Sequence, residues 1–198
     1  MKTYNYFIVE IPTRIKDTVT TDGGLEIYID NRFKEFDNRV NEGKVVAAPF
    51  KYDHGVEEGD TLYFHHHVVI NDGQPLTGHE DHYVVLYSHG PETPMASQAF
   101  AFKNQQGEIK LLSGWCLLEE VDEPEVEQST IVEAVSLEES PKLRGRVAFT
   151  SGEWMTDLGL EVGDIVGFQK NRDYRLKVDG KEYYRVRAED LLYVEEEV

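Results

Sequence analysis

Short runs of apolar residues, separated by glycine-containing turns, predict that this chain is built from β-strands. Such runs occur at 44–48, 61–70 and 165–169, where valine, isoleucine, tyrosine and phenylalanine are frequent. These residue types are typical of strands, and turns at intervals of roughly ten residues are typical of all-β domains. Only residues 188–190 indicate a helical turn. The pattern therefore predicts an all-β fold made of small β-barrels.

One part of this pattern occurs twice. Residues 56–64 read Val-Glu-Glu-Gly-Asp-Thr-Leu-Tyr-Phe, and residues 160–168 read Leu-Glu-Val-Gly-Asp-Ile-Val-Gly-Phe. Each copy follows a β-prone run that opens on a glycine and a basic residue, Gly43-Lys44 in the first copy and Gly145-Arg146 in the second. Two such hairpins, about a hundred residues apart, indicate a duplicated domain.

The duplication predicts two small β-barrels in tandem, at residues 1–120 and 121–198. The first would carry a long loop at about residues 17–36 and an insertion rich in histidine. The second is shorter and has no pair of glycines in the corresponding place. Residues 121–128 are acidic and contain a proline, which is typical of a linker or an exposed loop. The strand predicted at 115–119 could close the first barrel, open the second, or serve both.

The predicted loop contains an apolar strip directly after two glycines. Gly23 and Gly24 give the backbone conformational freedom that no other residue type allows. In the extended segment that follows, alternate side chains share one face, and these are Leu25, Ile27 and Ile29, with Tyr28 between them. The alternative interpretation is an ordinary hairpin, in which the glycines form the turn and residues 25–29 form a strand of the core.

Composition and charge exclude several classes of function and location for this chain. The chain has 198 residues, of which 40% are hydrophobic and 11% aromatic, enough to bury a core. A net charge of −18 would repel nucleic acids and anionic membranes, so we expect neither as a partner. The single Cys116 cannot form an intramolecular disulfide and so indicates a reducing compartment. No apolar run is long enough for a transmembrane span or a secretory signal, so we expect a cytoplasmic protein.

The sequence lacks the motifs that carry catalysis. It contains no Gly-x-Ser-x-Gly elbow, no phosphate-binding glycine-rich loop and no His-Glu-x-x-His helix. Cys116 lies on a predicted core strand, where a cysteine is commonly an inert apolar residue. We therefore expect no enzyme activity and no cofactor.

All seven histidines lie between residues 54 and 89. With neighbouring carboxylates they could bind zinc or another transition metal, and the candidates are His65, His67, His79 and His82. Three consecutive residues of one strand cannot all point at one ion, however, because successive side chains alternate between faces. Structural or surface histidines are therefore the favoured interpretation, and a His-rich metal-binding β-barrel stays an alternative.

The order of these elements resembles the GroES family of co-chaperonins, the ring-shaped lids of chaperonin folding chambers. The second copy carries the resemblance in residues 144–148 and 160–168 and in the closing segment 182–195, where Val-Gly-Asp-x-Val-x-Phe precedes an acidic, then apolar strand. Residues 18–27 resemble the mobile loop of the family, in which two glycines precede an apolar strip. Glu26 interrupts that strip here, and both copies lack the long hairpin that forms the roof of the family's dome.

The resemblance implies a function and partners. It implies a co-chaperonin that caps an ATP-dependent chaperonin ring of the GroEL type, assists protein folding and has no catalytic step. Docking on the chaperonin's apical domains would use Gly23, Gly24, Leu25, Ile27, Tyr28 and Ile29. It also implies a homo-oligomer, a heptameric ring by analogy with the family. Roofless, diverged lids resemble those of bacteriophages, which would place the protein in the host cytoplasm. The rival is a phage structural or interaction protein that has lost capping.

Overall fold

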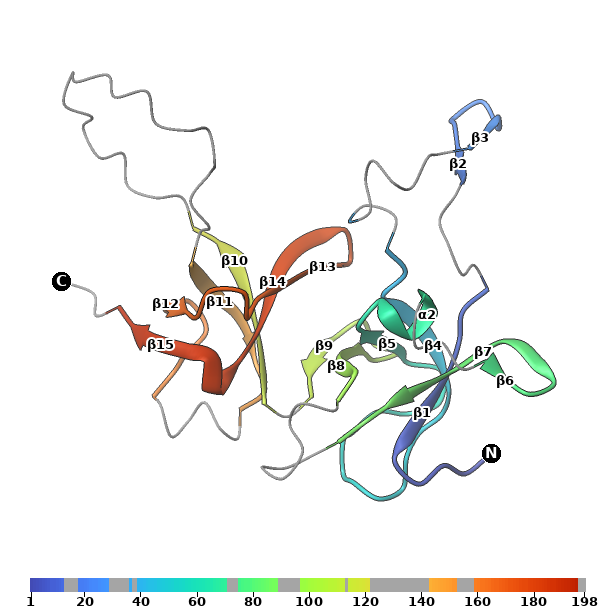
Figure 1. Cartoon of the computed structure of the whole chain (residues 1–198), viewed down its shortest axis with the longest axis horizontal. Helices are drawn as coiled ribbons and strands as arrows, with labels where there is room; N and C mark the ends of the chain where they lie inside the picture. The colour runs from blue at the N-terminus through green and yellow to red at the C-terminus, as the bar shows by residue number, and fades with distance from the viewer. Residues whose placement is uncertain are drawn as a thin grey trace.

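Figure 1 shows the computed structural model of the chain, whose described residues form two large β-sheets, one two-stranded sheet and very little helix. The residues it describes are 1–12, 18–28, 36, 39–70, 75–88, 97–112, 114–121, 143–152 and 159–195. The prediction of an all-β fold is confirmed. None of the helices in these ranges is long and apolar enough to cross a membrane.

The first sheet has seven antiparallel strands in the order β6-β7-β1-β4-β5-β8-β9. Its strands are β1 (Tyr6–Glu10), β4 (Glu42–Ala47), β5 (Thr61–Phe64), β6 (Pro75–Leu76), β7 (His79–Leu86), β8 (Ala99–Lys103) and β9 (Ile109–Leu111). A short helix, α2 (His67–Ile70), follows β5. A separate two-stranded sheet, β2 (Thr18–Thr20) and β3 (Glu26–Tyr28), lies between β1 and β4 in the sequence.

The second sheet has six antiparallel strands in the order β13-β14-β10-β11-β12-β15. Its strands are β10 (Trp115–Glu120), β11 (Arg144–Thr150), β12 (Ile165–Phe168), β13 (Tyr174–Val178), β14 (Lys181–Arg187) and β15 (Leu191–Val194). The 3-10 helix η2 (Ala188–Asp190) leads into β15, and it is the helical turn that the sequence indicates there.

The two sheets repeat one topology. Strands β1, β4, β5, β6, β7 and β8 of the first sheet correspond, in that order, to β10 through β15 of the second. With this correspondence the order of neighbouring strands is the same in both sheets, and β9 is the one strand of the first sheet without a counterpart. The pairing registers agree as well: Gly43 faces Leu62 across β4 and β5, and Gly145 faces Val166 across β11 and β12. Each copy also has an irregularity in the pairing of its first two strands. The duplication seen in the sequence is therefore a duplication of the fold.

The repeated Gly-Asp turn has the same hydrogen bonds in both copies. In the first, the amide of Gly59 donates to the carbonyl of Val45 at 2.8 Å. In the second, Gly163 donates to Val147 at 2.8 Å. The aspartate after each glycine accepts a hydrogen bond from the amide three residues earlier, at 2.9 Å in the first copy and 2.8 Å in the second. Both glycines have a positive φ, 96° and 106°, which favours glycine at this position.

The two sheets share one core. A single cluster of buried residues joins the first sheet to one face of the second, through Trp115, Leu117, Tyr174, Leu176, Val178 and Tyr183. The other face of the second sheet has a smaller core of its own, which contains Cys116 and Leu118. Strand β10 is therefore buried on both faces, which explains its uninterrupted apolar run from Trp115 to Leu118.

The structure decides one choice that the sequence left open and changes one predicted strand. Among the described residues, strand β10 pairs with β11 and β14, so it opens the second sheet. The strand predicted at 61–70 ends at Phe64, and helix α2 begins at His67. The backbone therefore turns at the three consecutive histidines, and these residues do not alternate as strand residues would.

Candidate functional site

The β2–β3 hairpin is the element that stands apart from the two cores, and Figure 1 shows it projecting away from the first sheet. Its strands pair in the register Thr18 to Tyr28, Val19 to Ile27 and Thr20 to Glu26. The turn is closed by the amide of Gly24, which donates to the carbonyl of Thr21 at 2.8 Å. Gly24 has a φ of 78°, and a side chain there would be strained. The predicted glycine hinge is thus the turn of a hairpin.

The apolar side chains of this hairpin are exposed to solvent. Leu25 is 65% exposed, Ile27 is 47% exposed and Tyr28 is 80% exposed. The other residues of the segment 22–28 are exposed as well. The hairpin of the alternative interpretation does form, but its second strand does not enter a core. An isolated two-stranded hairpin is only marginally stable in water, so exposed apolar side chains on it add little to the stability of the fold.

Three of the four apolar residues predicted as loop anchors lie within the described residues. Ile27 and Tyr28 lie on β3, and Leu25 directly precedes it, next to the turn that contains Gly23 and Gly24. Ile29 lies outside the described residues, as do residue 17 and residues 30–35 of the predicted 17–36 loop. Exposed apolar side chains therefore lie on and directly before β3, next to the hairpin turn.

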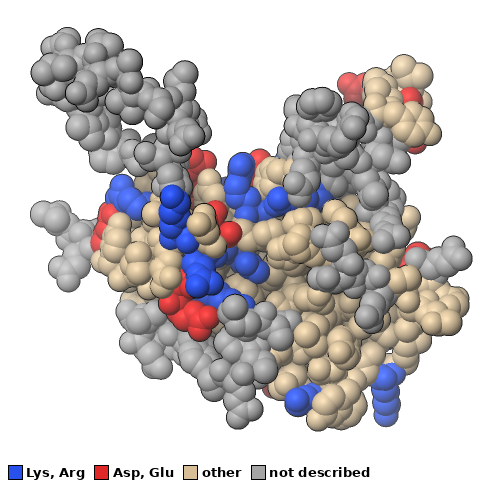
Figure 2. Space-filling view, viewed as in Figure 1, with Lys and Arg blue, Asp and Glu red and all other residues tan. Residues whose placement is uncertain are grey.

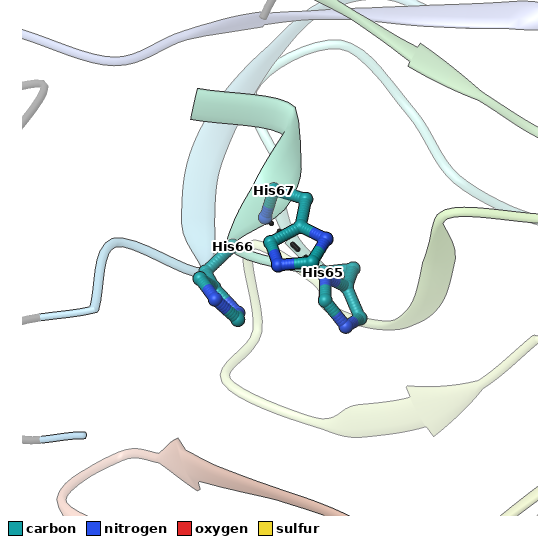
Figure 3. Close-up of side chains that lie close together, drawn as sticks. All are labelled: His65, His66 and His67. Atoms are coloured by element: carbon teal, nitrogen blue, oxygen red, sulfur yellow. Dashed lines mark hydrogen bonds between the residues drawn. The ribbon is translucent and has the colours of Figure 1, made fainter. Parts of the chain in front are cut away.

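A second group of side chains lies where β5 gives way to helix α2. His65, His66 and His67 offer ring nitrogens that all lie within 4.8 Å of one another, and Figure 3 shows the three rings side by side. The sequence argument against a shared ion assumed a strand through these residues and is wrong, because the backbone turns there. His66, which was not among the predicted candidates, is the buried member of the three.

Contacts to the second sheet hold two of these histidines in place. Nδ1 of His66 lies 2.8 Å from the hydroxyl of Tyr174, and that hydroxyl accepts the backbone amide of His66 at 3.2 Å. The rings of His65 and Tyr174 stack with centroids 4.4 Å apart. The pKa of His65 is lowered to about 3, mainly because burial disfavours the charged imidazole and also because His66, His67 and two arginines lie nearby. Nothing in the sequence signals the Tyr174 contact, since it joins residues far apart in the chain.

The other predicted histidine candidates form a separate pair. The rings of His79 and His82, both on β7, have centroids 4.9 Å apart. His82 Nδ1 lies 2.7 Å from a carboxylate oxygen of Asp81. Within the described residues, this pair does not join His65 and His67 in a common group of possible metal ligands.

Cationic side chains gather where the two sheets meet, in the middle of the face that Figure 2 shows. They line a cavity of about 290 Å³ together with acidic groups. Lys103 pairs with Asp179 across the junction, and Arg175 pairs with Glu182 at 2.7 Å. The lining therefore carries charges of both signs, and of these two ion pairs the one between Lys103 and Asp179 joins the two sheets.

The lone cysteine has no catalytic surroundings. Cys116 is fully buried in the smaller core, where its thiol lies 3.3 Å from the carbonyl of Val186. Burial raises the pKa of the thiol to about 12, so the nucleophilic thiolate is scarce at neutral pH.

Comparison with known proteins finds a co-chaperonin. The chain is similar to the co-chaperonin GroES of Coprothermobacter proteolyticus, with 36% identity over 92 residues. The match covers 94% of that relative and 44% of this chain. No protein-family model matches. The relative is therefore covered almost completely by less than half of the present chain.

Proposed function

Because the chain belongs to the GroES co-chaperonin family, we propose that it is a lid that caps an ATP-dependent chaperonin ring and thereby assists protein folding. Its two GroES-like domains divide between β9 and β10, and the first bears the docking element. The observation that carries the proposal is the β2–β3 hairpin, with its exposed apolar side chains on a projection clear of both cores. No catalytic step is required of the lid, and neither a cofactor nor a nucleic acid nor a membrane takes part.

The hairpin would dock on the apical domains of a GroEL-type chaperonin. Leu25, Ile27 and Tyr28 are the anchors that the described residues offer, with Ile29 as the next along the strip. Burying an apolar side chain of this size is worth about 1.5–3 kcal/mol, so three anchors together give roughly 5 kcal/mol before losses. Ordering of side chains and loss of free motion consume much of that gain. One hairpin alone would therefore bind weakly.

A ring of identical chains would overcome that weakness, because the second and later hairpins bind at a high effective concentration. Strand β15 lies at an edge of the second sheet. It exposes Leu192 and Tyr193, which are 60% and 48% accessible. The N-terminal part of the first copy exposes Tyr4 and Phe50. Such edges and patches favour lateral association of chains, and the family resemblance makes a heptameric ring the first state to look for.

A cytoplasmic location, in the host cytoplasm if the chain is encoded by a phage, follows from the same proposal. The competing function is a structural or interaction protein that keeps the fold and does not cap. The observation in its favour is the pairing of β2 with β3, because this alternative expects an ordered segment where capping expects a mobile loop. The two proposals differ in one measurable property, which is affinity for a chaperonin.

The deciding experiment is native mass spectrometry of the purified chain mixed with a GroEL-type chaperonin, with and without ATP. We expect an ATP-dependent complex that the substitution Ile27→Asp abolishes, because a carboxylate in an apolar groove is strongly unfavourable. The matched control is Val162→Asp, since Val162 is also exposed, at 65%, but lies in the Gly-Asp turn of the second copy. This control should still bind.

Two results would count against capping by the hairpin. If Ile27→Asp binds as well as the unmodified chain, the hairpin is not the contact. If the unmodified chain forms a clean oligomer but no complex with the chaperonin, the structural or interaction role is the better account of the fold.

A further inference from the structure

The three consecutive histidines form a group whose geometry differs from that of surface histidines met by chance. Their ring centroids are 4.7 Å apart for His65 and His66, 4.4 Å for His65 and His67, and 4.5 Å for His66 and His67. The three spacings are nearly equal, and Figure 3 shows the three rings at the turn that leads into α2. Three rings gathered in this way can converge on one point.

The spacing of the ring nitrogens is close to that of a metal site. Two histidine nitrogens bound to one tetrahedral zinc ion lie about 3.4 Å apart, since each Zn–N bond is about 2.1 Å. In the structure one nitrogen from each of the three rings lies within 4.8 Å of the others. Each nitrogen–nitrogen distance therefore has to shorten by about 1.4 Å at most, a change on the scale of a side-chain rotation. The hydrogen bond from the amide of His67 to Nδ1 of His65 is long, 3.3 Å, and is lost at small cost.

The surroundings supply an outer contact of the kind that metal-binding histidines have. A histidine that binds a metal through one nitrogen usually makes a hydrogen bond through the other, which fixes the ring orientation and the position of its proton. Tyr174 provides this contact to His66, with its hydroxyl 2.8 Å from Nδ1. Tyr174 is itself only 8% exposed, so the contact is held by the packing of the two sheets.

The accessibility of the group also suits an ion. His66 is buried, His65 is partly buried, and His67 is exposed. An ion can therefore reach the group from solvent on the side of His67. Two cations oppose a divalent ion here, because Arg39 and Arg185 lie close enough to lower the pKa of His65. Their repulsion makes the expected site weaker than a structural zinc site with thiolate ligands.

We propose that His65, His66 and His67 together bind a divalent transition metal ion, with Zn²⁺ as the first choice, at the junction of the two sheets. Three imidazoles suit Zn²⁺, Co²⁺, Ni²⁺ and Cu²⁺, and they suit Mg²⁺ and Ca²⁺ poorly. Through Tyr174, the bound ion links the turn before α2 to β13, so that occupancy strengthens the contact between the two domains. The proposal is independent of capping and stands or falls without it.

The test uses the full chain after treatment with a chelator. Zn²⁺ binding is measured by isothermal titration calorimetry, and Co²⁺ binding by the visible absorption that nitrogen ligands produce. We expect one ion per chain, together with a rise in Tm on addition of Zn²⁺, because a ligand that binds only the folded state stabilises it. His67→Asn should weaken binding by at least tenfold and remove the rise in Tm. Since His67 is exposed, this substitution should leave the fold intact.

Two further variants complete the test. His82→Asn removes a histidine of the separate pair on β7 and should leave metal affinity unchanged. Tyr174→Phe keeps the stacked ring but removes the hydroxyl, and it should weaken binding about tenfold or more. Absence of Zn²⁺ and Co²⁺ binding by the unmodified chain would overturn the proposal, as would a site lost in His82→Asn and kept in His67→Asn. Unchanged affinity in Tyr174→Phe would overturn the role given to Tyr174.

Discussion

The substitution Gly145→Ala tests whether the repeated glycine is required by close packing of two strands. Gly145 lies on β11 and faces β10, where it pairs with Glu120. A Cβ atom built there would lie 2.7 Å from Cβ of Leu118 and 3.1 Å from the carbonyl oxygen of Glu119. Both neighbours are attached to or part of the backbone, so neither can rotate away. Leu118 is also fully buried.

The size of the effect follows from these distances. Carbon atoms in contact prefer a separation of at least about 3.5 Å, so the new methyl group is about 0.8 Å too close. Overpacking of this kind costs about 1–3 kcal/mol. Replacing a glycine also restricts the unfolded chain, which returns about 0.5–1 kcal/mol. We therefore expect a net loss of about 1–2 kcal/mol in the free energy of unfolding.

Urea denaturation followed by tryptophan fluorescence measures this loss. Gly43→Ala, the matching change in the first copy, should cost less, because its nearest contacts are 3.0–3.1 Å and one of them is the side-chain atom Cγ1 of Ile11. Gly23→Ala is the control, since its Cβ would meet only Thr21 Oγ1 at 3.9 Å, and it should be neutral or stabilise the chain by up to about 1 kcal/mol. The reasoning is refuted if Gly145→Ala is as stable as Gly23→Ala.

Two further predictions concern buried groups. The thiol of Cys116, whose pKa burial raises to about 12, should react with a disulfide reagent at neutral pH far more slowly in the native chain than in urea, and rapid native labelling would contradict its placement. Arg185 has a buried Nε without a hydrogen-bond partner among the described residues, and its guanidinium carbon lies 4.2 Å from the centre of the Trp115 ring. Arg185→Met should therefore change the free energy of unfolding by less than about 1 kcal/mol. Arg185→Ala should cost about 2 kcal/mol or more, because it leaves a cavity. Equal losses for the two variants in urea denaturation would show that the charge itself stabilises the junction.

The duplicated hairpin was predictable because its determinants are local. A glycine with a positive φ, an aspartate that binds the amide three residues back and a following apolar strand all lie within nine residues in each copy. The same holds for the Gly23-Gly24 turn, where the sequence predicts a turn and an apolar strip. Whether that strip is buried depends on the rest of the fold, which explains why the sequence left a loop and a core strand both open.

The histidine group and the shared core were not predictable from local patterns. The run from Thr61 to Ile70 is apolar enough to read as one strand, but the chain turns after Phe64, and no turn residue marks the place. Tyr174 contacts His66 across 108 residues of sequence. The sequence left open which sheet the strand at 115–119 joins, because the apolar run of β10 is compatible with either, and its pairing with β11 and β14 decides.

The distribution of apolar surface explains why the hairpin is the better candidate for a contact with another protein than the junction is. At the junction, Trp115 and Leu117 are 3% and 0% exposed, so their burial already stabilises the chain. On the hairpin, Leu25 and Tyr28 remain largely exposed, and a two-stranded hairpin gains almost nothing from them. Exposed apolar side chains lower solubility unless a partner covers them. A chain with a net charge of −18 has ample polar residues to place there instead, and the proposed docking on a partner gives the apolar strip a use that the fold itself does not.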